Sequence, residues 1–279
     1  MKKLSVVAAS LFGAALLPSS AFAEPSISQL WQTEASLKVP ESVRYDAQRQ
    51  VLYVSNVDGE NPWALDGVGS ISRVALDGTI LDAQWVSGMD GPKGMDIAGN
   101  NLYVTDIDDV VTINIETGEI IGRIAVPDAV KINDLSVGED GTIYITDSSV
   151  GAIYKLVNGT FTTVASGLAK LNGVLHSQGE LLFLSDGGLY IAGENGAHTL
   201  IAQGMAGATD GVERIDDDNW LVSCWKGTVY HVTRAGEVTL LLDGREAGIN
   251  AADLGYDPVN RIAYFPNFWK NTVSAYQLN

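Results

Sequence analysis

Cysteine and histidine are scarce in this sequence: its 279 residues contain one cysteine, Cys224, and three histidines. A single cysteine excludes any disulfide within the chain, so a hydrophobic core or a bound metal must stabilise the fold. The same scarcity leaves no set of Cys and His side chains of the kind that favours zinc. It also gives little support for a catalytic pair of histidines.

Basic residues are outnumbered as well, with 17 Lys and Arg against 34 Asp and Glu, a formal net charge of −17. Two of the 17 are Lys2 and Lys3, so the chain after its first 23 residues has 15 basic and 34 acidic side chains, a net charge of −19. Nucleic acids and anionic membrane surfaces are bound by excess Lys and Arg, so neither is an expected partner. We expect a monomer whose partner is a small molecule.

Long hydrophobic runs are missing, with one exception at the N-terminus. The chain begins with MKK, continues with LSVVAASLFGAALL and then reads PSSAFA. A charged start, a short apolar stretch and a small-residue ending are typical of a cleaved secretory signal, and the apolar run is too short to span a bilayer. We therefore expect residues 1–23 to be a signal peptide and residues 24–279 to form one periplasmic or secreted domain without membrane insertion.

Sustained helical periodicity is also missing, and a strand-like repeat of about 40 residues takes its place. Each repeat contains an apolar strand, such as LYVTD or LFLSD, that ends in a small residue. These strand-end residues are Asn56, Asp106, Asp147, Asp186, Cys224 and Asn267. We expect the polar ones to bond backbone donors of neighbouring loops. Later in the repeats, glycine turns such as Asp77-Gly78 and Asn158-Gly159 suit tight hairpins, because glycine accepts a positive φ.

Six such repeats predict an all-β fold, a six-bladed β-propeller of four-stranded blades. The last repeat is one strand short, because the chain ends after NTVSAYQLN. Residues 28–39, SQLWQTEASLKV, precede the first repeat and supply the missing strand in this interpretation. Such a closure joins the two ends of the chain and removes an open sheet edge.

One aligned position stands directly before the first strand of each repeat. It is occupied by Glu41, Lys93, Asn133, Asn172, Asp210 and Ala252. In a propeller these first strands line the central channel and all start on one face, which we call the anchor face. Glu41, Asn133, Asn172 and Asp210 are therefore expected to converge at one mouth of the channel. Their oxygen atoms suit a hard cation, Ca²⁺ before Mg²⁺, Mn²⁺ or Zn²⁺. The alternative is that they are ordinary turn residues that cap loops.

These segments resemble the SMP-30/gluconolactonase family, which includes regucalcin and bacterial lactonases. The resemblance covers essentially the whole chain after the signal peptide. It is most specific in KINDLSVGEDGTIYITD, LNGVLHSQGELLFLSD and TDGVERIDDDNWLVSCWKGTVYHV. It implies one divalent cation bound by Glu41, Asn172 and Asp210, with Asn133 contacting substrate or completing the metal shell. Lys131 stands where animal members have an arginine that holds substrate.

The resemblance further implies a metal-dependent lactonase or esterase that acts on lactones or related esters, sugar-acid lactones included. A bound cation polarises the carbonyl group and stabilises the oxyanion that forms when water attacks. We expect Asp210 either to accept the proton of the water as general base or to serve only as a ligand. Lys131 is expected to hold oxygen atoms of the substrate.

Aromatic residues in the loops of the anchor face are candidates for a substrate-binding wall. Residues 57–69 form the longest of these loops and place Trp63 beside Glu41. Trp225 and Trp269 stand in equivalent loops of the fifth and sixth repeats. Such rings suit a sugar ring or an apolar acyl chain; the alternative is that each packs a junction between blades.

Two other function classes stay open at this stage. The first is a non-catalytic propeller that binds a ligand or a protein and uses its metal ion only for stability. The second is a quinone-dependent sugar dehydrogenase on a similar ring, which needs His and Arg side chains at the channel. Only His176 and Arg214 are placed for that role.

Overall fold

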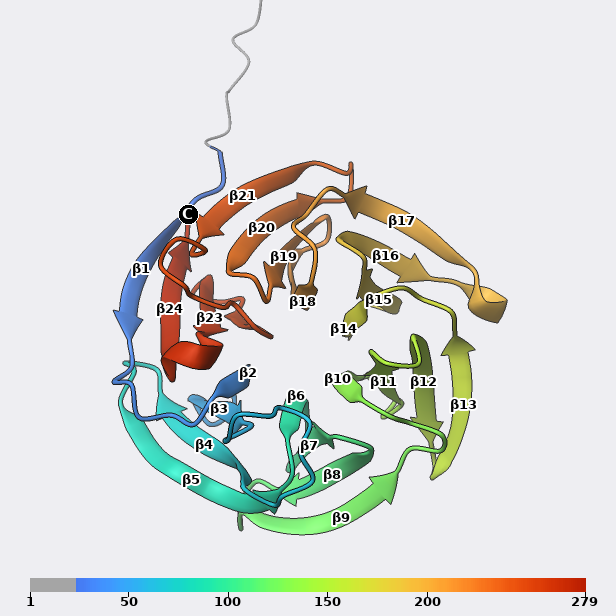
Figure 1. Cartoon of the computed structure of the whole chain (residues 1–279). Helices are drawn as coiled ribbons and strands as arrows, with labels where there is room; N and C mark the ends of the chain where they lie inside the picture. The colour runs from blue at the N-terminus through green and yellow to red at the C-terminus, as the bar shows by residue number, and fades with distance from the viewer. Residues whose placement is uncertain (1–23) are drawn as a thin grey trace, which may run out of the picture.

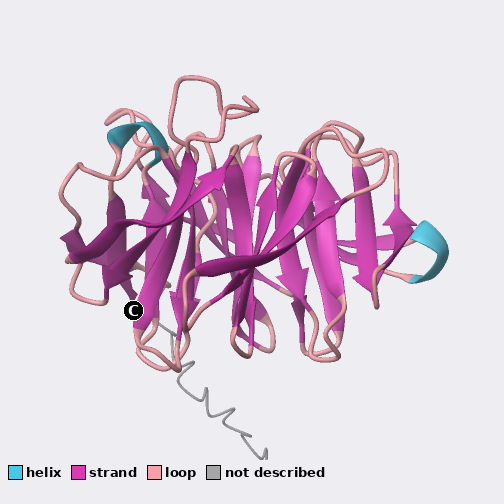
Figure 2. Ribbon diagram, turned by 90° about the horizontal axis from the view of Figure 1, so that it is seen from below, coloured by secondary structure: helices cyan, strands magenta, loops and turns pink. Residues whose placement is uncertain are grey.

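The computed structural model describes residues 24–279, so the predicted signal peptide lies outside the described residues. These residues form six four-stranded antiparallel sheets, arranged as blades around a central axis (Figure 1). The predicted six-bladed propeller is therefore confirmed. Figure 2 shows the disc from its edge, with the strands running between two layers of loops.

The first three blades follow one another along the chain, and each runs from the central axis outward. Blade 1 consists of β2 (Pro40–Asp46), β3 (Val51–Asn56), β4 (Gly69–Ala75) and β5 (Ile80–Met89). Blade 2 consists of β6 (Pro92–Ala98), β7 (Asn101–Asp106), β8 (Asp109–Asn114) and β9 (Glu119–Ala125). Blade 3 consists of β10 (Ile132–Val137), β11 (Ile143–Asp147), β12 (Ala152–Val157) and β13 (Thr160–Ala165).

Blades 4 and 5 repeat this order, and blade 6 combines both ends of the chain. Blade 4 consists of β14 (Leu171–Ser177), β15 (Glu180–Ser185), β16 (Gly188–Ala192) and β17 (His198–Gln203). Blade 5 consists of β18 (Thr209–Asp216), β19 (Asn219–Cys224), β20 (Thr228–Thr233) and β21 (Val238–Asp243). Blade 6 consists of β22 (Gly255–Asp257), β23 (Ile262–Pro266), β24 (Val273–Leu278) and β1 (Ile27–Gln32).

The two helical segments in the described part of the chain are single 3-10 turns, η1 (Glu194–Gly196) and η2 (Phe268–Lys270). Among residues 24–279 no helix has the length and hydrophobicity needed to span a membrane.

Burial decreases from the axis to the rim of the disc and explains the sequence pattern of the strands. The second strand of blade 1, VLYVSN in β3, is buried along its whole length. The outermost strand of blade 2, EIIGRIA in β9, alternates between exposed and partly buried residues. A strand covered on both faces needs a continuous apolar run, whereas a rim strand covered on one face needs alternation.

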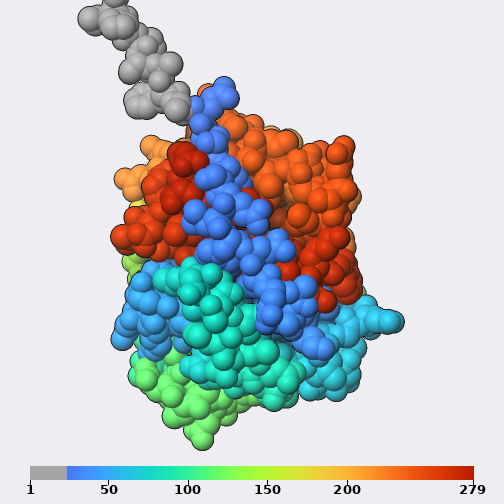
Figure 3. All heavy atoms as spheres, turned by 90° about the vertical axis from the view of Figure 1, so that its left-hand side faces the viewer, coloured from blue at the N-terminus to red at the C-terminus, as the bar shows by residue number. Residues whose placement is uncertain are grey.

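The N-terminal strand closes the ring as predicted, because β1 pairs antiparallel with β24 on the outer edge of blade 6. The strand is shorter than the predicted range of 28–39: its ladder ends with the bond from Thr33 N to Val273 O, 2.9 Å long. The indole nitrogen of Trp31 donates to Leu76 O at 2.8 Å. This bond joins blade 6 to blade 1 at the seam, the junction where the ring closes. Figure 3 shows the N-terminal segment, in blue, lying across the outer side of the C-terminal blade and reaching the first blade at its lower end.

The predicted glycine hairpins connect the third and fourth strands of blades 1 to 5, on the face opposite the anchor face. The glycine of each turn adopts a positive φ, which a residue with a Cβ adopts only at a cost in energy. The φ angles are 89° at Gly78, 71° at Gly118, 78° at Gly159, 79° at Gly196 and 90° at Gly236.

In residues 24–279, six of the seven hydrophobic clusters form a ring, one at each junction between neighbouring blades. The seventh is small and contains Val39, Val57, Ala252 and Phe268. At the junction of blades 4 and 5, the fully buried Trp220 lies with Leu182 and Val222. At the seam between blades 6 and 1, Tyr264 lies with Val43. Because every blade packs on both neighbours, the starts of the inner strands have fixed positions around the axis.

Candidate functional site

A cavity of about 230 Å³ lies where the inner strands start, at the anchor face. All four predicted ligands line it, together with six further residues. The lining residues are Glu41, Pro62, Trp63, Lys93, Asn133, Asn172, Ala208, Asp210, Trp225 and Phe268. The structure thus places the four side chains, which come from four blades, around one cavity. Their binding of a metal ion stays a prediction.

An extra residue at the start of the inner strands aims these side chains at the cavity. In β14 the strand pairing skips from Leu171 to Val174, so that Asn172 and Gly173 lie together opposite Leu184. β2, β6, β10 and β18 each contain one extra residue at the equivalent place. Such a bulge interrupts the ladder and turns a side chain out of the sheet. It sets the direction of the cavity-facing side chains in five of the six blades.

The glycines of the Asn-Gly and Asp-Gly steps serve close approach between strands. A Cβ on Gly173 would lie 2.2 Å from the carbonyl oxygen of Asp210, and one on Gly211 would lie 2.2 Å from Asp253 Oδ1. Neither glycine adopts a positive φ, so neither is the turn glycine that the alternative interpretation assumes. The glycine follows the cavity residue because the next inner strand leaves no space for a side chain.

Three buried oxygen atoms of this cavity have no hydrogen-bond partner among residues 24–279: Glu41 Oε2, Asn172 Oδ1 and Asp210 Oδ1. Glu41 and Asp210 are almost fully buried, with 5% and 2% exposure, whereas Asn172 is half-buried. An unpaired buried polar atom costs about 1–3 kcal/mol, so three of them around one cavity require a common explanation. A cation held between them would satisfy all three, and the residues present therefore fit a bound metal ion.

The two carboxyl groups repel each other in this buried setting. Burial raises the pKa of Glu41 to about 8, opposed by the Lys93 ammonium and reinforced by Asp253. Burial also raises the pKa of Asp210 well above its ordinary value, reinforced by Glu41 and Asp253. A cation between the two would favour their charged forms and lower both pKa values.

The donor set is a mixed one. Among the residues that the structure describes, no three His, Cys, Asp or Glu side chains form a group that could hold a metal. The candidate set instead combines the carboxylates of Glu41 and Asp210 with the amide of Asn172. Carboxylate and amide oxygens are the ligands of Ca²⁺ and other hard cations.

Asn133 and Lys131 come from the start of β10. Asn133 lines the cavity, and its Nδ2 donates to Ser148 Oγ at 3.2 Å, so Oδ1 is the acceptor atom that this side chain offers. The Lys131 side chain lies outside the set of lining residues, and its Nζ is 5.1 Å from the ring centroid of Trp63. Lys131 thus stands at the rim of the cavity, next to its aromatic wall.

The aromatic wall consists of Trp63, Trp225 and Phe268, which all line the cavity. Trp225 and Phe268 pack edge to face, with ring centroids 5.8 Å apart. Trp269, a predicted substrate contact, is 46% exposed and lies outside the lining set, packed against Phe268 at 4.7 Å. The aromatic contribution of blade 6 therefore comes from Phe268. Phe268 and Trp269 are adjacent in the sequence and are followed by Lys270. Nothing in this segment shows which of the two rings lines the cavity.

The sequence placed Lys93 at the aligned position on the anchor face but did not predict its burial. Lys93 is 2% exposed, and its Nζ donates to Pro62 O at 2.7 Å and to Gly91 O at 2.9 Å. Burial lowers the pKa of Lys93 to about 8, opposed by the carboxylate of Glu41. Its alignment with the four predicted ligands was the available signal, but a sequence pattern does not show that a lysine is buried.

Charged and polar side chains continue below the cavity. Ser42 Oγ donates to Asp253 Oδ2 at 2.6 Å. Further along the axis, Arg44 forms ion pairs of 2.7 Å with both Asp96 and Glu213. Burial raises the pKa of Asp253 to about 6 and that of Glu213 to about 7. The interior of the ring is therefore a polar column between the two faces.

The row of polar residues at the ends of the second strands has mostly the predicted structural role. Asp106 Oδ1 accepts from Gly91 N at 2.8 Å, and Asp147 Oδ2 accepts from Val130 N at 2.7 Å. Both bonds hold the loop that leads into an inner strand. Asp186 differs, because it lies on the surface and forms an ion pair with Lys170.

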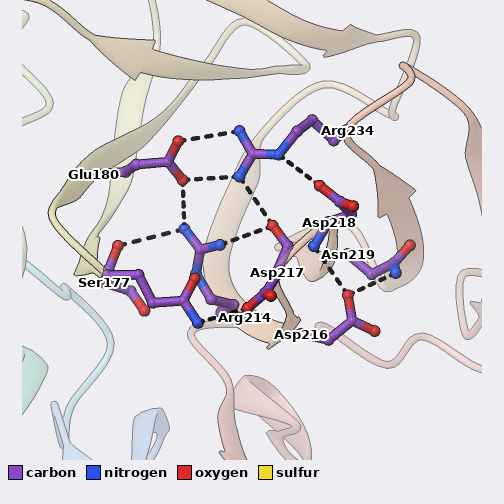
Figure 4. A network of polar contacts seen from close by, with 9 residues as sticks. Ser177, Glu180, Arg214, Asp216, Asp217, Asp218, Asn219 and Arg234 are labelled. Atoms are coloured by element: carbon purple, nitrogen blue, oxygen red, sulfur yellow. Dashed lines mark hydrogen bonds and ion pairs between the residues drawn. The ribbon is translucent and has the colours of Figure 1, made fainter.

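Arg214 and His176, which a dehydrogenase would need at the channel, have other surroundings. Arg214 Nη2 bonds Glu180 Oε2 at 2.7 Å, and Arg234 shares this carboxylate at 2.9 Å (Figure 4). Both guanidinium groups also lie against the ring of Trp220. Neither Arg214 nor His176 lines the anchor-face cavity. These contacts tie blades 4 and 5 together and give the dehydrogenase interpretation no support.

No protein-family model and no curated protein matches this sequence. Several solved structures share its fold. A streptogramin B lyase has a TM-score of 0.69 at 12% identity, over 94% of this chain and 100% of that chain. A protein described as a gluconolactonase has a TM-score of 0.67 at 16% identity, over 92% and 93%. A chain of a nidogen/laminin complex has a TM-score of 0.63 at 16% identity, over 78% and 84%. Identities this low show a common fold and leave the family resemblance a prediction.

Proposed function

We propose that this chain is an exported hydrolase that acts on lactones or related esters with the help of one divalent cation, Ca²⁺ as first choice. The observation that carries the proposal is the set of unpartnered oxygen atoms of Glu41, Asn172 and Asp210 in one cavity. The resemblance of the sequence to the SMP-30/gluconolactonase family supports it. The likeness in fold to a protein described as a gluconolactonase is in line with it.

In this proposal Glu41, Asn172 and Asp210 hold the cation, and Asn133 Oδ1 completes the set. Such a cation, when bound, polarises a carbonyl group and lowers the pKa of water. The depth of the site keeps bulk water away from the carboxylates, which strengthens every electrostatic contact there. Trp63 and Trp225 provide apolar walls that orient the substrate ring or chain.

In the proposed reaction two further roles fall to side chains, proton transfer to Asp210 and substrate binding to Lys131. Water adds to the carbonyl carbon of the lactone, the ring C–O bond breaks, and the ring oxygen leaves as a hydroxyl group of the product acid. Asp210 accepts a proton from the attacking water and returns it to the leaving oxygen. Lys131, at the rim, donates to oxygen atoms of the substrate and faces the carboxylate of the product.

A non-catalytic binding propeller is the second candidate. The observation that favours it is the likeness in fold to a chain from a protein–protein complex. The same oxygen atoms would then hold a cation that only stabilises the ring. Both candidates require a bound cation, and only the first requires turnover.

The deciding experiment uses residues 24–279 purified without chelator. Bound metal is identified by elemental analysis, and aldonolactones, acyl lactones and aryl esters are assayed with and without EDTA. We expect lactone hydrolysis that EDTA abolishes and Ca²⁺ restores. Hydrolysis that survives complete removal of the metal would refute the hydrolase mechanism, and a bound metal without hydrolysis of any substrate would favour the binding propeller.

Variants assign the activity to the site. Asp210→Asn should lower kcat by at least about 100-fold if Asp210 moves the proton, because general base catalysis contributes roughly 10²–10⁴-fold. Asp186→Asn is the matched control, since Asp186 lies on the surface outside the cavity. Full turnover by Asp210→Asn with unchanged Ca²⁺ affinity would remove the base role. Export is tested separately by fractionating cells that produce the chain with and without residues 1–23.

A further inference from the structure

Lys93 has a buried charge that the proposed chemistry does not use. Lysine is almost never fully buried unless its ammonium group is paired, yet Lys93 is 2% exposed. Its hydrogen bonds go to two uncharged acceptors, Pro62 O at 2.7 Å and Gly91 O at 2.9 Å. Gly91 belongs to the entry of its own blade, whereas Pro62 belongs to the long loop of residues 57–69 in blade 1. The lysine therefore joins that loop to blade 2.

A third contact involves the remaining N–H donor of the Lys93 ammonium group. Lys93 Nζ lies 4.1 Å from the ring centroid of Trp63, a distance that permits a cation–π interaction. An ammonium group has three N–H donors, and two carbonyl oxygens and one aromatic face use all three. Lys93 thus has no donor left for a substrate. It acts on the site through other residues.

The fit around this contact is tight. A Cβ on Gly91 would lie 2.8 Å from Pro62 O and 3.3 Å from Lys93 Nζ. Lys131 Nζ lies 5.1 Å from the same Trp63 ring, so a second ammonium group contacts the wall that Lys93 holds. Trp63 is consequently fixed by charges from blades 2 and 3, although its own loop belongs to blade 1.

We propose that Lys93 is a positioning residue with two effects on the cavity. It pins residues 57–69 across the anchor face, so that Trp63 forms a wall of the cavity. Its positive charge also opposes a cation bound by Glu41 and Asp210, which line the same cavity, and therefore limits the affinity of the site for that cation. The second effect rests on the proposed function, whereas the first does not.

Lys93→Met tests both effects, because methionine is apolar and lacks the ammonium group. Removing a positive charge from a buried cation site should tighten Ca²⁺ binding, on the order of tenfold, as measured by titration calorimetry. Amide hydrogen exchange in residues 57–69 should become at least about tenfold faster, because the loop loses its contacts with Lys93. KM for any hydrolysed substrate should rise more than kcat falls.

Two further variants separate the effects. Trp63→Leu removes the aromatic face and should speed exchange in residues 57–69, with Ca²⁺ affinity unchanged within about twofold. Lys170→Met is the matched control, because Lys170 precedes Asn172 on the anchor face but its ammonium group pairs with Asp186 at the surface. It should change neither Ca²⁺ affinity nor exchange.

Several outcomes would overturn the proposal. Wild-type Ca²⁺ affinity in Lys93→Met refutes the effect on cation binding, and wild-type exchange in residues 57–69 refutes the effect on the loop. If the unmodified chain binds no divalent cation, the proposed function fails, and the exchange measurement still decides the role of Lys93 in the loop. Should Lys93→Met fail to fold, Trp63→Leu decides: continued protection of residues 57–69 refutes the role of the contact between Lys93 and the Trp63 ring in holding the loop.

Discussion

The pH dependence of stability should reveal the buried carboxyl group of Glu213. Its Oε1 accepts a 2.7 Å bond from Arg44, whose other ion pair is with Asp96. The Glu213 side chain is 14% exposed. Burial raises its pKa from 4.5 to about 7; the Arg44 guanidinium opposes this rise, while Asp253 and Asp96 add to it. Glu213→Gln keeps an oxygen acceptor for Arg44 and removes the titration.

The sign of the effect follows from the direction of the pKa change. The folded chain binds the proton of Glu213 more tightly than the unfolded chain does. The resulting stabilisation is fully present below pH 4.5 and is lost as the pH rises through about 7. A pKa difference of about 2.5 corresponds to roughly 3 kcal/mol. The free energy of unfolding of the wild type, relative to Glu213→Gln, should therefore fall by that amount between pH 4.5 and 7.5.

The assay is urea unfolding of residues 24–279 with EDTA present, repeated at several pH values between 4.5 and 7.5. Groups that titrate in both chains cancel in the difference between wild type and variant. Glu139→Gln, at an exposed position, is the control and should run parallel to the wild type. Parallel profiles for wild type and Glu213→Gln, within about 1 kcal/mol, would show that Glu213 is not held in a setting that disfavours its charge.

Three further predictions concern the ring itself. The thiol of Cys224 is 0% exposed and burial raises its pKa to about 12, so it should react with a disulfide reagent only upon unfolding; rapid labelling of the folded chain would contradict its burial. Gly211→Ala should lower the free energy of unfolding by about 1–3 kcal/mol, because its Cβ would lie 2.2 Å from Asp253 Oδ1. Gly207→Ala is the control, because a Cβ there meets open space. Equal thermal stability of the two variants would contradict the close approach at Gly211. Trp31→Ala should lower the free energy of unfolding by about 3 kcal/mol and loosen the seam, measured by urea unfolding; a loss below 1 kcal/mol would contradict its role there.

The propeller could be predicted from the sequence because its signals are local and repeated. Apolar strands that end in a small residue, as at Asp106 and Asp147, mark the second strand of a blade. Glycine turns such as the one at Gly78 mark the hairpins. Six copies of such a unit have one arrangement that leaves no long sheet edge open, and the N-terminal strand supplies the missing part of it.

The candidate site could be predicted in position but not in its atomic contacts. The alignment placed Asn133 and Asp210 at the same point of their blades, and circular closure brought them together. It could not show that the extra residue in five of the six inner strands turns the side chain toward the axis, because this depends on the pairing register. It could not show that Lys93 is buried under the loop of Trp63, because that contact joins two blades through a loop of irregular backbone.

The bulges at the starts of the inner strands make the side chains that line the cavity independent of the strand pairing that forms the ring. Each extra residue lies outside the strand ladder, so its side chain can be exchanged while the pairing of its blade stays the same. Aligned positions accordingly hold a lysine in β6, asparagines in β10 and β14 and an aspartate in β18. New combinations of charge and size could be installed at this mouth one blade at a time, which makes the chain a scaffold for designed sites.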